Sequence, residues 1–201
     1  MFGFSSDEMK LLRKLSSPVL VQDYLESIPI NTEPDGDSCI SPRRVMRERR
    51  AHCIEGAMLA AAAFAVHGER PLLLDLVSVS RDFDHVVALF RKFNRWGAVS
   101  KTNHAVLRYR EPVYATIREL AMSYFHEYFT DDGTKTMRRY SRPFDLSKFN
   151  DRGWMTAADN LWYIAEALDD SRHYDILTPP MIRNLRKADP IEREAGKLTH
   201  Y

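Results

Sequence analysis

Apolar residues recur with the period of a helix in the first third of the chain. Residues 7–15 follow this period and are succeeded by a Ser-Ser-Pro sequence that ends a helix. Turn-forming residues dominate the stretch that follows, and Ser41-Pro42 is a typical helix start, with a capping hydroxyl before a proline at the first helical position. The pattern predicts these elements: helices over 7–15 and 19–28, a loop over 31–41 and a helix from Pro42.

The apolar stripe changes face between Val45 and Ile54. These residues are nine positions apart, which leaves them about half a turn out of phase at 3.6 residues per turn. We therefore predict two helices with a bend near residues 48–52. The second helix then begins at Cys53, where the N–H groups of the first turn have no partner within the helix.

The middle of the chain changes to the alternation that is typical of strands. The change follows Gly68, a good C-cap for the preceding helix. Three strands are predicted, over 71–79, 83–90 and 96–100, and the last two are close enough to form a hairpin with Asn94 in the left-handed conformation. Beyond them, the pattern predicts helices over 112–129 and 154–168, a short helix after Pro179-Pro180 and a charged, solvated tail over 187–201.

Strand alternation also predicts where His85 points. His85 shares a face with Val87 and Leu89, so we expect it to look toward the core, where the helix of Cys53 would pack. The predicted hairpin would put His85 opposite residues 101–103.

Composition favours one α+β domain over residues 1–201, with a core at about 38–130 and helical additions at both ends. The chain has 201 residues, of which 44% are hydrophobic, enough for a sizeable core. Its 29 Lys and Arg nearly balance its 28 Asp and Glu, which gives no reason to expect a nucleic-acid or membrane partner. Two cysteines make no disulfide framework and no signal sequence is visible, so we expect a cytoplasmic protein.

A cysteine at a helix start followed by a strand histidine is the arrangement of a thiol nucleophile and its base. Only the thiolate is nucleophilic, and a helix N-terminus beside an imidazolium lowers the pKa of a thiol from about 8.5 to between about 3.5 and 7.5. Cys53 and His85 have this order. A third group should orient the imidazole through its other nitrogen, and we expect it among residues 100–104.

This arrangement resembles the transglutaminase-like branch of the papain-like cysteine enzymes, in which the histidine strand is followed by an acid or amide. The resemblance covers roughly residues 38–105 and implies a papain-like core, with the cysteine helix packed on a small antiparallel sheet. It rests on three stretches, which also look like those of an uncharacterised bacterial group in that superfamily: Arg50-Ala51-His52-Cys53-Ile54-Glu55-Gly56-Ala57, Asp82-Phe83-Asp84-His85-Val86-Val87-Ala88-Leu89-Phe90 and Trp96-Gly97-Ala98-Val99-Ser100-Lys101-Thr102-Asn103-His104.

The resemblance implies acyl transfer through a thioester: hydrolysis of a peptide or protein amide, or passage of the acyl group to an amine. Cys53 would be the nucleophile and His85 the base, with no cofactor. Transglutaminase-like enzymes usually place an aspartate about four residues after the tryptophan of the third strand, and here that position is Ser100. Asn103, an amide like the third member in papain-like proteases, is the preferred candidate for this role, ahead of Ser100.

Two other functions remain open at this point. The departure at Ser100 is compatible with a catalytically degenerate domain whose cleft binds a peptide or protein partner. The arginines between 43 and 50 could contact phosphate, but Glu48 interrupts them, and a solvated helix face is the favoured interpretation.

The remaining candidate residues carry little signal. Cys39 lies in the turn-rich loop and is interpreted as non-catalytic. His52, Cys53 and His67 do not have the spacing of zinc ligands, so no metal is expected.

Overall fold

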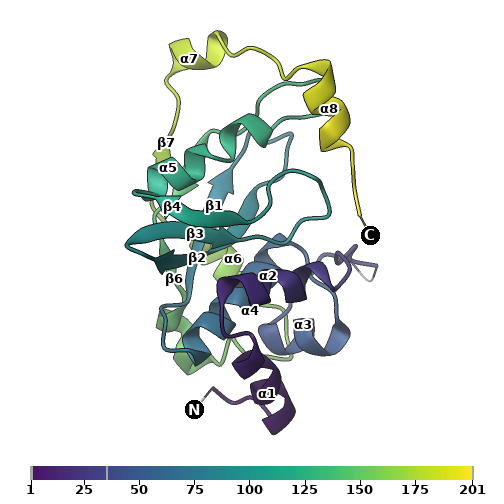
Figure 1. Ribbon diagram of the computed structural model, residues 1–201, viewed down its shortest axis with the longest axis vertical. Helices are drawn as coiled ribbons and strands as arrows, with labels where there is room; N and C mark the ends of the chain where they lie inside the picture. Colours follow the sequence, from purple (N-terminus) through teal and green to yellow (C-terminus); the bar gives the residue numbers. More distant parts are fainter. Residues whose placement is uncertain (1, 35, 201) are drawn as a thin grey trace.

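The computed structural model describes residues 2–34 and 36–200, so the parts of the predicted loop and tail at 35 and 201 lie outside it, as does residue 1. Within these ranges the chain forms an antiparallel sheet with helices on both faces (Figure 1), which confirms the predicted α+β class. The helices are α1 (Ser6–Lys14), α2 (Pro18–Glu26), α3 (Pro42–Glu48), α4 (Cys53–Val66), α5 (Ile117–Met122), α6 (Trp162–Asp169), α7 (Pro179–Arg183) and α8 (Pro190–Gly196), with short 3-10 helices η1 (Phe125–Glu127) and η2 (Leu146–Arg152). The strands are β1 (Leu72–Val77), β2 (His85–Lys92), β3 (Arg95–Val99), β4 (Arg110–Tyr114), β5 (Arg139–Ser141), β6 (Phe144–Asp145) and β7 (His173–Asp175).

The strand order is β4-β3-β2-β1-β5-β7, and β6 pairs with the start of β1. Figure 1 shows α1 to α4 below the sheet and α5, α7 and α8 above it. In the part of the chain that the structure describes, no helix combines the length and the apolar character that a membrane span requires.

Strand alternation divides the core between the two faces of the sheet. Val86 and Ala88 of β2 pack in the cluster that contains α4, whereas Val87 and Leu89 pack in the cluster that contains α5. Helix α4 is buried almost all round, because its alanines let neighbouring helices and strands approach closely. The N-terminus of this buried helix therefore has a fixed position relative to β2.

The predicted bend between α3 and α4 is confirmed. Helix α3 ends at Glu48, and Arg49 follows in the left-handed conformation, with φ at 53°. Ala51 then makes backbone hydrogen bonds with residues 29 and 31, which hold the bend in an extended conformation. Helix α4 consequently begins at Cys53.

The predicted hairpin between β2 and β3 is also confirmed. Phe93 and Asn94 both have positive φ values, 52° and 59°, as a two-residue turn matched to the strand twist requires. Ala88 pairs with Val99, and β3 ends there. The chain after Val99 leaves the sheet, so on the β3 side the first residues of β2 have no strand partner, whereas on the other side Leu76 of β1 pairs with His85.

The helix predicted over 112–129 is wrong in its first part. Residues 110–114 form β4 at the edge of the sheet, where the side chain of Val113 is exposed. The helix starts only after Thr116, whose hydroxyl accepts a hydrogen bond from the amide of Glu119. The spacing of the apolar residues in this stretch suggested a helix. An edge strand buries only some of its apolar residues, so they do not mark it as a strand.

The helix predicted over 154–168 also begins later than expected, at Trp162. Trp154 is fully buried, but it follows η2, and its indole N–H donates to the side chain of Asn150. Its burial therefore comes from a compact turn rather than from a helix face.

The C-terminal tail differs from the predicted solvated segment. A short helix does begin at Pro179, but α8 follows it within the tail. Leu198 and His200 then make backbone hydrogen bonds with residues 105 and 103. The tail is thus joined to the loop that follows β3.

Candidate active site

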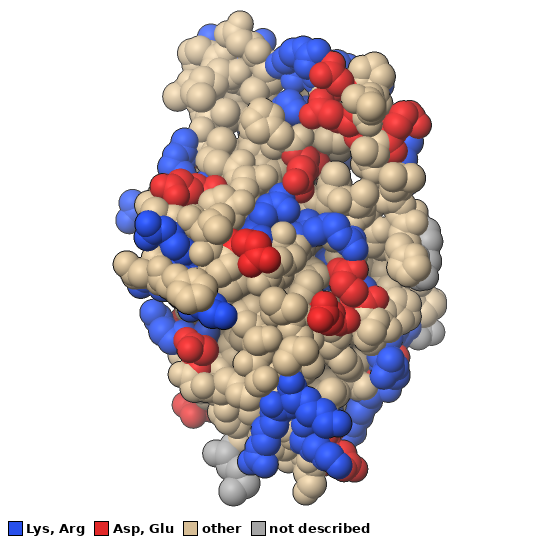
Figure 2. Space-filling view, viewed as in Figure 1, with Lys and Arg blue, Asp and Glu red and all other residues tan. Residues whose placement is uncertain are grey.

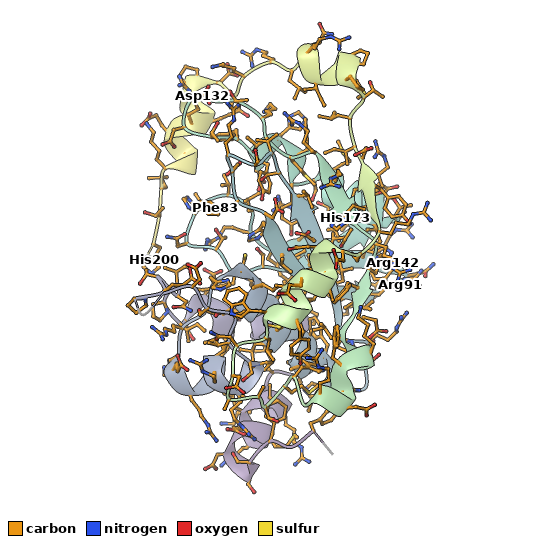
Figure 3. All side chains as sticks on the ribbon, turned by 180° about the vertical axis from the view of Figure 1, so that it is seen from behind. Phe83, Arg91, Asp132, Arg142, His173 and His200 are labelled. Atoms are coloured by element: carbon orange, nitrogen blue, oxygen red, sulfur yellow. The ribbon has the colours of Figure 1, made fainter. Side chains whose placement is uncertain are left out.

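A cleft of about 1150 Å³ opens where the N-terminus of α4 meets the start of β2. Cys53 and His85 both line it, together with the loop after β3 and residues 127–132. Figure 3 shows two further lining residues, Phe83 and Asp132, on the same side of the molecule. The structure therefore brings the predicted nucleophile and base to one cavity.

Cys53 has the environment of a reactive thiol. It is the first residue of α4 and is partly exposed to the cleft. Burial raises the pKa of its thiol, but hydrogen bonds from His52 and His85 and the charges of both rings outweigh this effect, and the pKa is lowered to about 5. The helix N-terminus favours the thiolate further.

Cys39 has the opposite environment. It is fully buried, and burial together with the nearby Glu55 carboxylate raises its pKa to about 12. A neutral, enclosed thiol is unreactive. This geometry agrees with the non-catalytic interpretation of Cys39.

His85 is held by Ser100. The His85 Nε2 lies 2.8 Å from the Ser100 hydroxyl oxygen, and that hydroxyl lies 2.6 Å from the carbonyl oxygen of Leu107. Because a carbonyl only accepts, the hydroxyl proton points to Leu107, and His85 Nε2–H donates to Ser100. The Nδ1 atom of His85 is then left for Cys53.

The prediction that strand alternation turns His85 toward α4 is wrong. Its alternation partners Val87 and Leu89 pack toward α5, on the face of the sheet away from α4. His85 nevertheless contacts Cys53, because it is the first residue of β2. Its ring lies at the end of the sheet, where it reaches the first residue of α4.

Asn103, the preferred candidate for the third group, does not take that place. Both ring nitrogens of His85 are already engaged, one by Ser100 and the other by Cys53. Asn103 lines the cleft three residues farther on, and its backbone carbonyl accepts a hydrogen bond from the amide of His200.

Ser100 rather than Asn103 faces His85 because two long-range hydrogen bonds, which we call the clamp, fix Ser100. The Gln22 side chain of α2 accepts a hydrogen bond from the Ser100 backbone amide at 2.9 Å and donates one to its carbonyl at 2.8 Å. Lys101 turns away and donates to the carbonyls of residues 25 and 28, at the end of α2. The clamp ends β3 before Ser100 and turns the Ser100 hydroxyl toward His85.

His52 is a site residue that the sequence pattern does not indicate as part of the thiol centre. Its Nε2 lies 2.9 Å from the carbonyl oxygen of Ser38, and its ring hydrogen-bonds to the Cys53 sulfur. Burial lowers the pKa of His52, but the hydrogen bond and charge of Cys53 and the charge of Glu55 outweigh this and raise it to about 9. The signal in the sequence is its position immediately before the cysteine, at the helix N-cap.

Glu55 fixes the position of His52. It is fully buried, and its carboxylate accepts hydrogen bonds from the backbone amides of His52 and Ile40 at 2.9 Å each. The side chains of Asn31 and Ser38 also donate to it. One carboxylate thus joins the helix start to the loop before α3.

Tyr128 holds the chain just before β2. Its buried hydroxyl hydrogen-bonds to the carbonyl oxygen of Phe83, two residues before His85. Burial raises the pKa of Tyr128 far above its usual value, so it remains a neutral donor. Phe83 itself extends into solvent at the edge of the cleft, 90% exposed.

The arginines between 43 and 50 are largely engaged within the protein. Figure 2 shows Lys and Arg interspersed with Asp and Glu over the visible face, with one basic group near α1. Four of the five arginines make ion pairs: Arg43 and Arg47 with Glu8, and Arg44 and Arg50 with Glu48. This pairing supports the solvated helix face over a phosphate-binding surface.

In residues 2–34 and 36–200, no three His, Cys, Asp or Glu side chains gather in an arrangement that would hold a metal ion. Comparison with protein-family models finds none that matches this chain, and comparison with curated proteins finds no significant match. The function is therefore inferred from the geometry of the cleft.

Proposed function

We propose that the protein is a cysteine-dependent enzyme of transglutaminase-like, papain-like type, which hydrolyses an amide or transfers its acyl group to an amine through a thioester. One observation carries the proposal. A thiol at a helix N-terminus lines one cleft with His85, which lowers the pKa of that thiol and whose outer nitrogen is fixed by Ser100. This combination of nucleophile, base and orienting group in one cleft is the one that thiol catalysis uses, and it supports the proposal.

The proposed reaction begins with attack of the Cys53 thiolate on the carbonyl carbon of an amide. The negative charge that develops on the carbonyl oxygen is stabilised by the backbone N–H of Cys53, at the helix N-terminus. As the C–N bond breaks, His85 donates a proton to the leaving amine. Water or a second amine then attacks the thioester and transfers a proton to His85.

A second candidate function is binding alone: the domain would have the cleft but would catalyse no reaction in it. The observation that favours it is the neutral partner of His85. Ser100 accepts a hydrogen bond but cannot offset the charge of an imidazolium, as an aspartate would. In this case the cleft would bind a peptide or protein segment without reacting with it.

Acyl transfer from p-nitrophenyl acetate tests the proposal without knowledge of the natural substrate. We expect rapid release of nitrophenolate, a peptide containing acetylated Cys53 in the mass spectrum, and faster loss of the acetyl group when hydroxylamine is added. Cys39→Ala should keep this behaviour, whereas Cys53→Ala and His85→Gln should abolish turnover.

Two results would contradict acyl transfer. Acetylation spread equally over both cysteines would show that the cleft does not activate Cys53. A stable acetyl group on Cys53 that neither water nor hydroxylamine removes would favour the binding domain.

A further inference from the structure

We propose that His52 is a second catalytic histidine: it holds a fixed positive charge beside Cys53, while His85 is the histidine that exchanges protons. The inference rests on the proposed function for its role in the reaction. The arrangement of charge, however, can be measured with no substrate present.

The two histidines contact the same thiol in similar ways. The Nε2 of His52 faces the Ser38 carbonyl oxygen, and the Nε2 of His85 faces the Ser100 hydroxyl. Each of these outer nitrogens therefore carries a proton, and each ring presents Nδ1 to Cys53. Since one thiol can give its proton to only one of these rings, the surroundings of the rings decide which of them keeps a charge throughout the reaction.

Those surroundings differ in charge. The Nε2 of His52 lies 3.3 Å from the Glu55 carboxylate and 3.5 Å from that of Glu33, in addition to the Ser38 carbonyl. The outer nitrogen of His85 meets only a neutral hydroxyl. An imidazolium is stabilised by nearby carboxylates, so the permanent charge belongs on His52.

The groups that face this centre come from three parts of the chain. Helix α4 contributes Glu55, the loop before α3 contributes Glu33, and β2 contributes His85. Tyr128 also lies near Cys53 but stays neutral, because burial raises its pKa beyond any physiological pH. The raised pKa of His52, about 9, agrees with a charge that persists at neutral pH.

This division of roles gives a balanced reaction. Before the substrate binds, the thiol proton has passed to Nδ1 of His52, Cys53 is a thiolate, and Nδ1 of His85 carries a proton taken up from solvent. The C–S bond then forms and the C–N bond breaks, and the leaving amine takes a proton from His85. The attacking water then forms the C–O bond and returns a proton to His85, the C–S bond breaks to release the acid and restore the thiolate, and His52 keeps its proton throughout.

The test measures iodoacetamide alkylation of Cys53 as a function of pH in a Cys39→Ala background. We expect a midpoint near pH 5 in this background, as the pKa of Cys53 indicates. His52→Gln should raise the midpoint by roughly two pH units or more, since it removes a fixed charge next to sulfur. His85→Gln should raise it by less than His52→Gln does.

His67→Gln is the matched control. His67 caps the other end of α4, about 20 Å away, and its Nε2 likewise contacts a backbone carbonyl, that of Leu12. This substitution should leave the alkylation midpoint of Cys53 unchanged.

Nitrogen-15 NMR of the histidine rings gives a second measurement that needs no variant at the site. We expect both ring nitrogens of His52 to carry protons at pH 7 in the unsubstituted protein. A neutral His52 ring at this pH, or a larger midpoint shift from His85→Gln than from His52→Gln, would overturn the proposal. If acetyl transfer fails but these charge measurements hold, the thiolate centre is present and only the acyl-transfer function is wrong.

Discussion

At pH 7, iodoacetamide should alkylate Cys53 about 100-fold faster than Cys39 in the folded protein. The pKa values of the two thiols, about 5 and about 12, differ by about seven units. Cys53 is then almost entirely thiolate, whereas only about one Cys39 in 10⁵ is ionised. A thiolate of lower pKa is intrinsically less nucleophilic, by about three powers of ten over this interval, so the net ratio is about 10². Burial of Cys39 increases the ratio further.

Peptide mass spectrometry after timed quenching measures both rates in one sample. The rate at Cys53 should be level from about pH 6 to 8 and fall to half near pH 5, because the thiolate is lost only below its lowered pKa. In concentrated urea both thiols should react alike, as ordinary cysteines. A half-maximal rate for Cys53 near pH 8.5 in the folded protein would refute the reasoning, since it would mean that the two imidazoles do not stabilise the thiolate.

Four substitutions test the supports of the site. Ser100→Ala removes the acceptor for the base and should lower turnover of an activated ester about tenfold with little loss of thermal stability, whereas Asn103→Ala should leave turnover within about twofold of the unsubstituted protein. Glu55→Gln places an amide among buried donors and should lower the free energy of unfolding by about 2–4 kcal/mol in urea titrations; an unchanged unfolding midpoint would argue against the carboxylate network. Gly56→Ala would bring a methyl group to 2.5 Å from the Cβ of Lys101 and should cost about 1–3 kcal/mol of stability, unless the chain after β3 can move away from α4.

The sequence was sufficient to predict that a helix begins at Cys53 and that His85 lies in a strand. The phase shift between Val45 and Ile54 is a local signal, and it correctly indicated that a helix begins at Cys53. The alternation around His85 correctly indicated a strand. It did not indicate the right face, because the first residue of a strand lies at the end of the sheet, where alternation no longer decides its contacts.

The third member depended on information that no local pattern contains. Ser100 and Gln22 are 78 positions apart, and their two hydrogen bonds determine where β3 ends. The predicted register continues the strand to residues 101–103, and within that range the resemblance to papain-like proteases, which use an amide as third member, favoured Asn103. His52 was overlooked for a related reason, since an N-cap residue leaves the helix geometry and can turn its ring toward its neighbour Cys53.

The clamp on Ser100 also bears on where the working unit of this protein starts. Sequence patterning assigned the core to about residues 38–130 and treated the first two helices as additions. A truncated chain that begins after α2 would keep Cys53 and His85 but lose both hydrogen bonds from Gln22. Such a fragment should still contain an alkylatable thiol, yet its His85 ring would be free to rotate, so we expect the proposed activity to require the chain from at least residue 18.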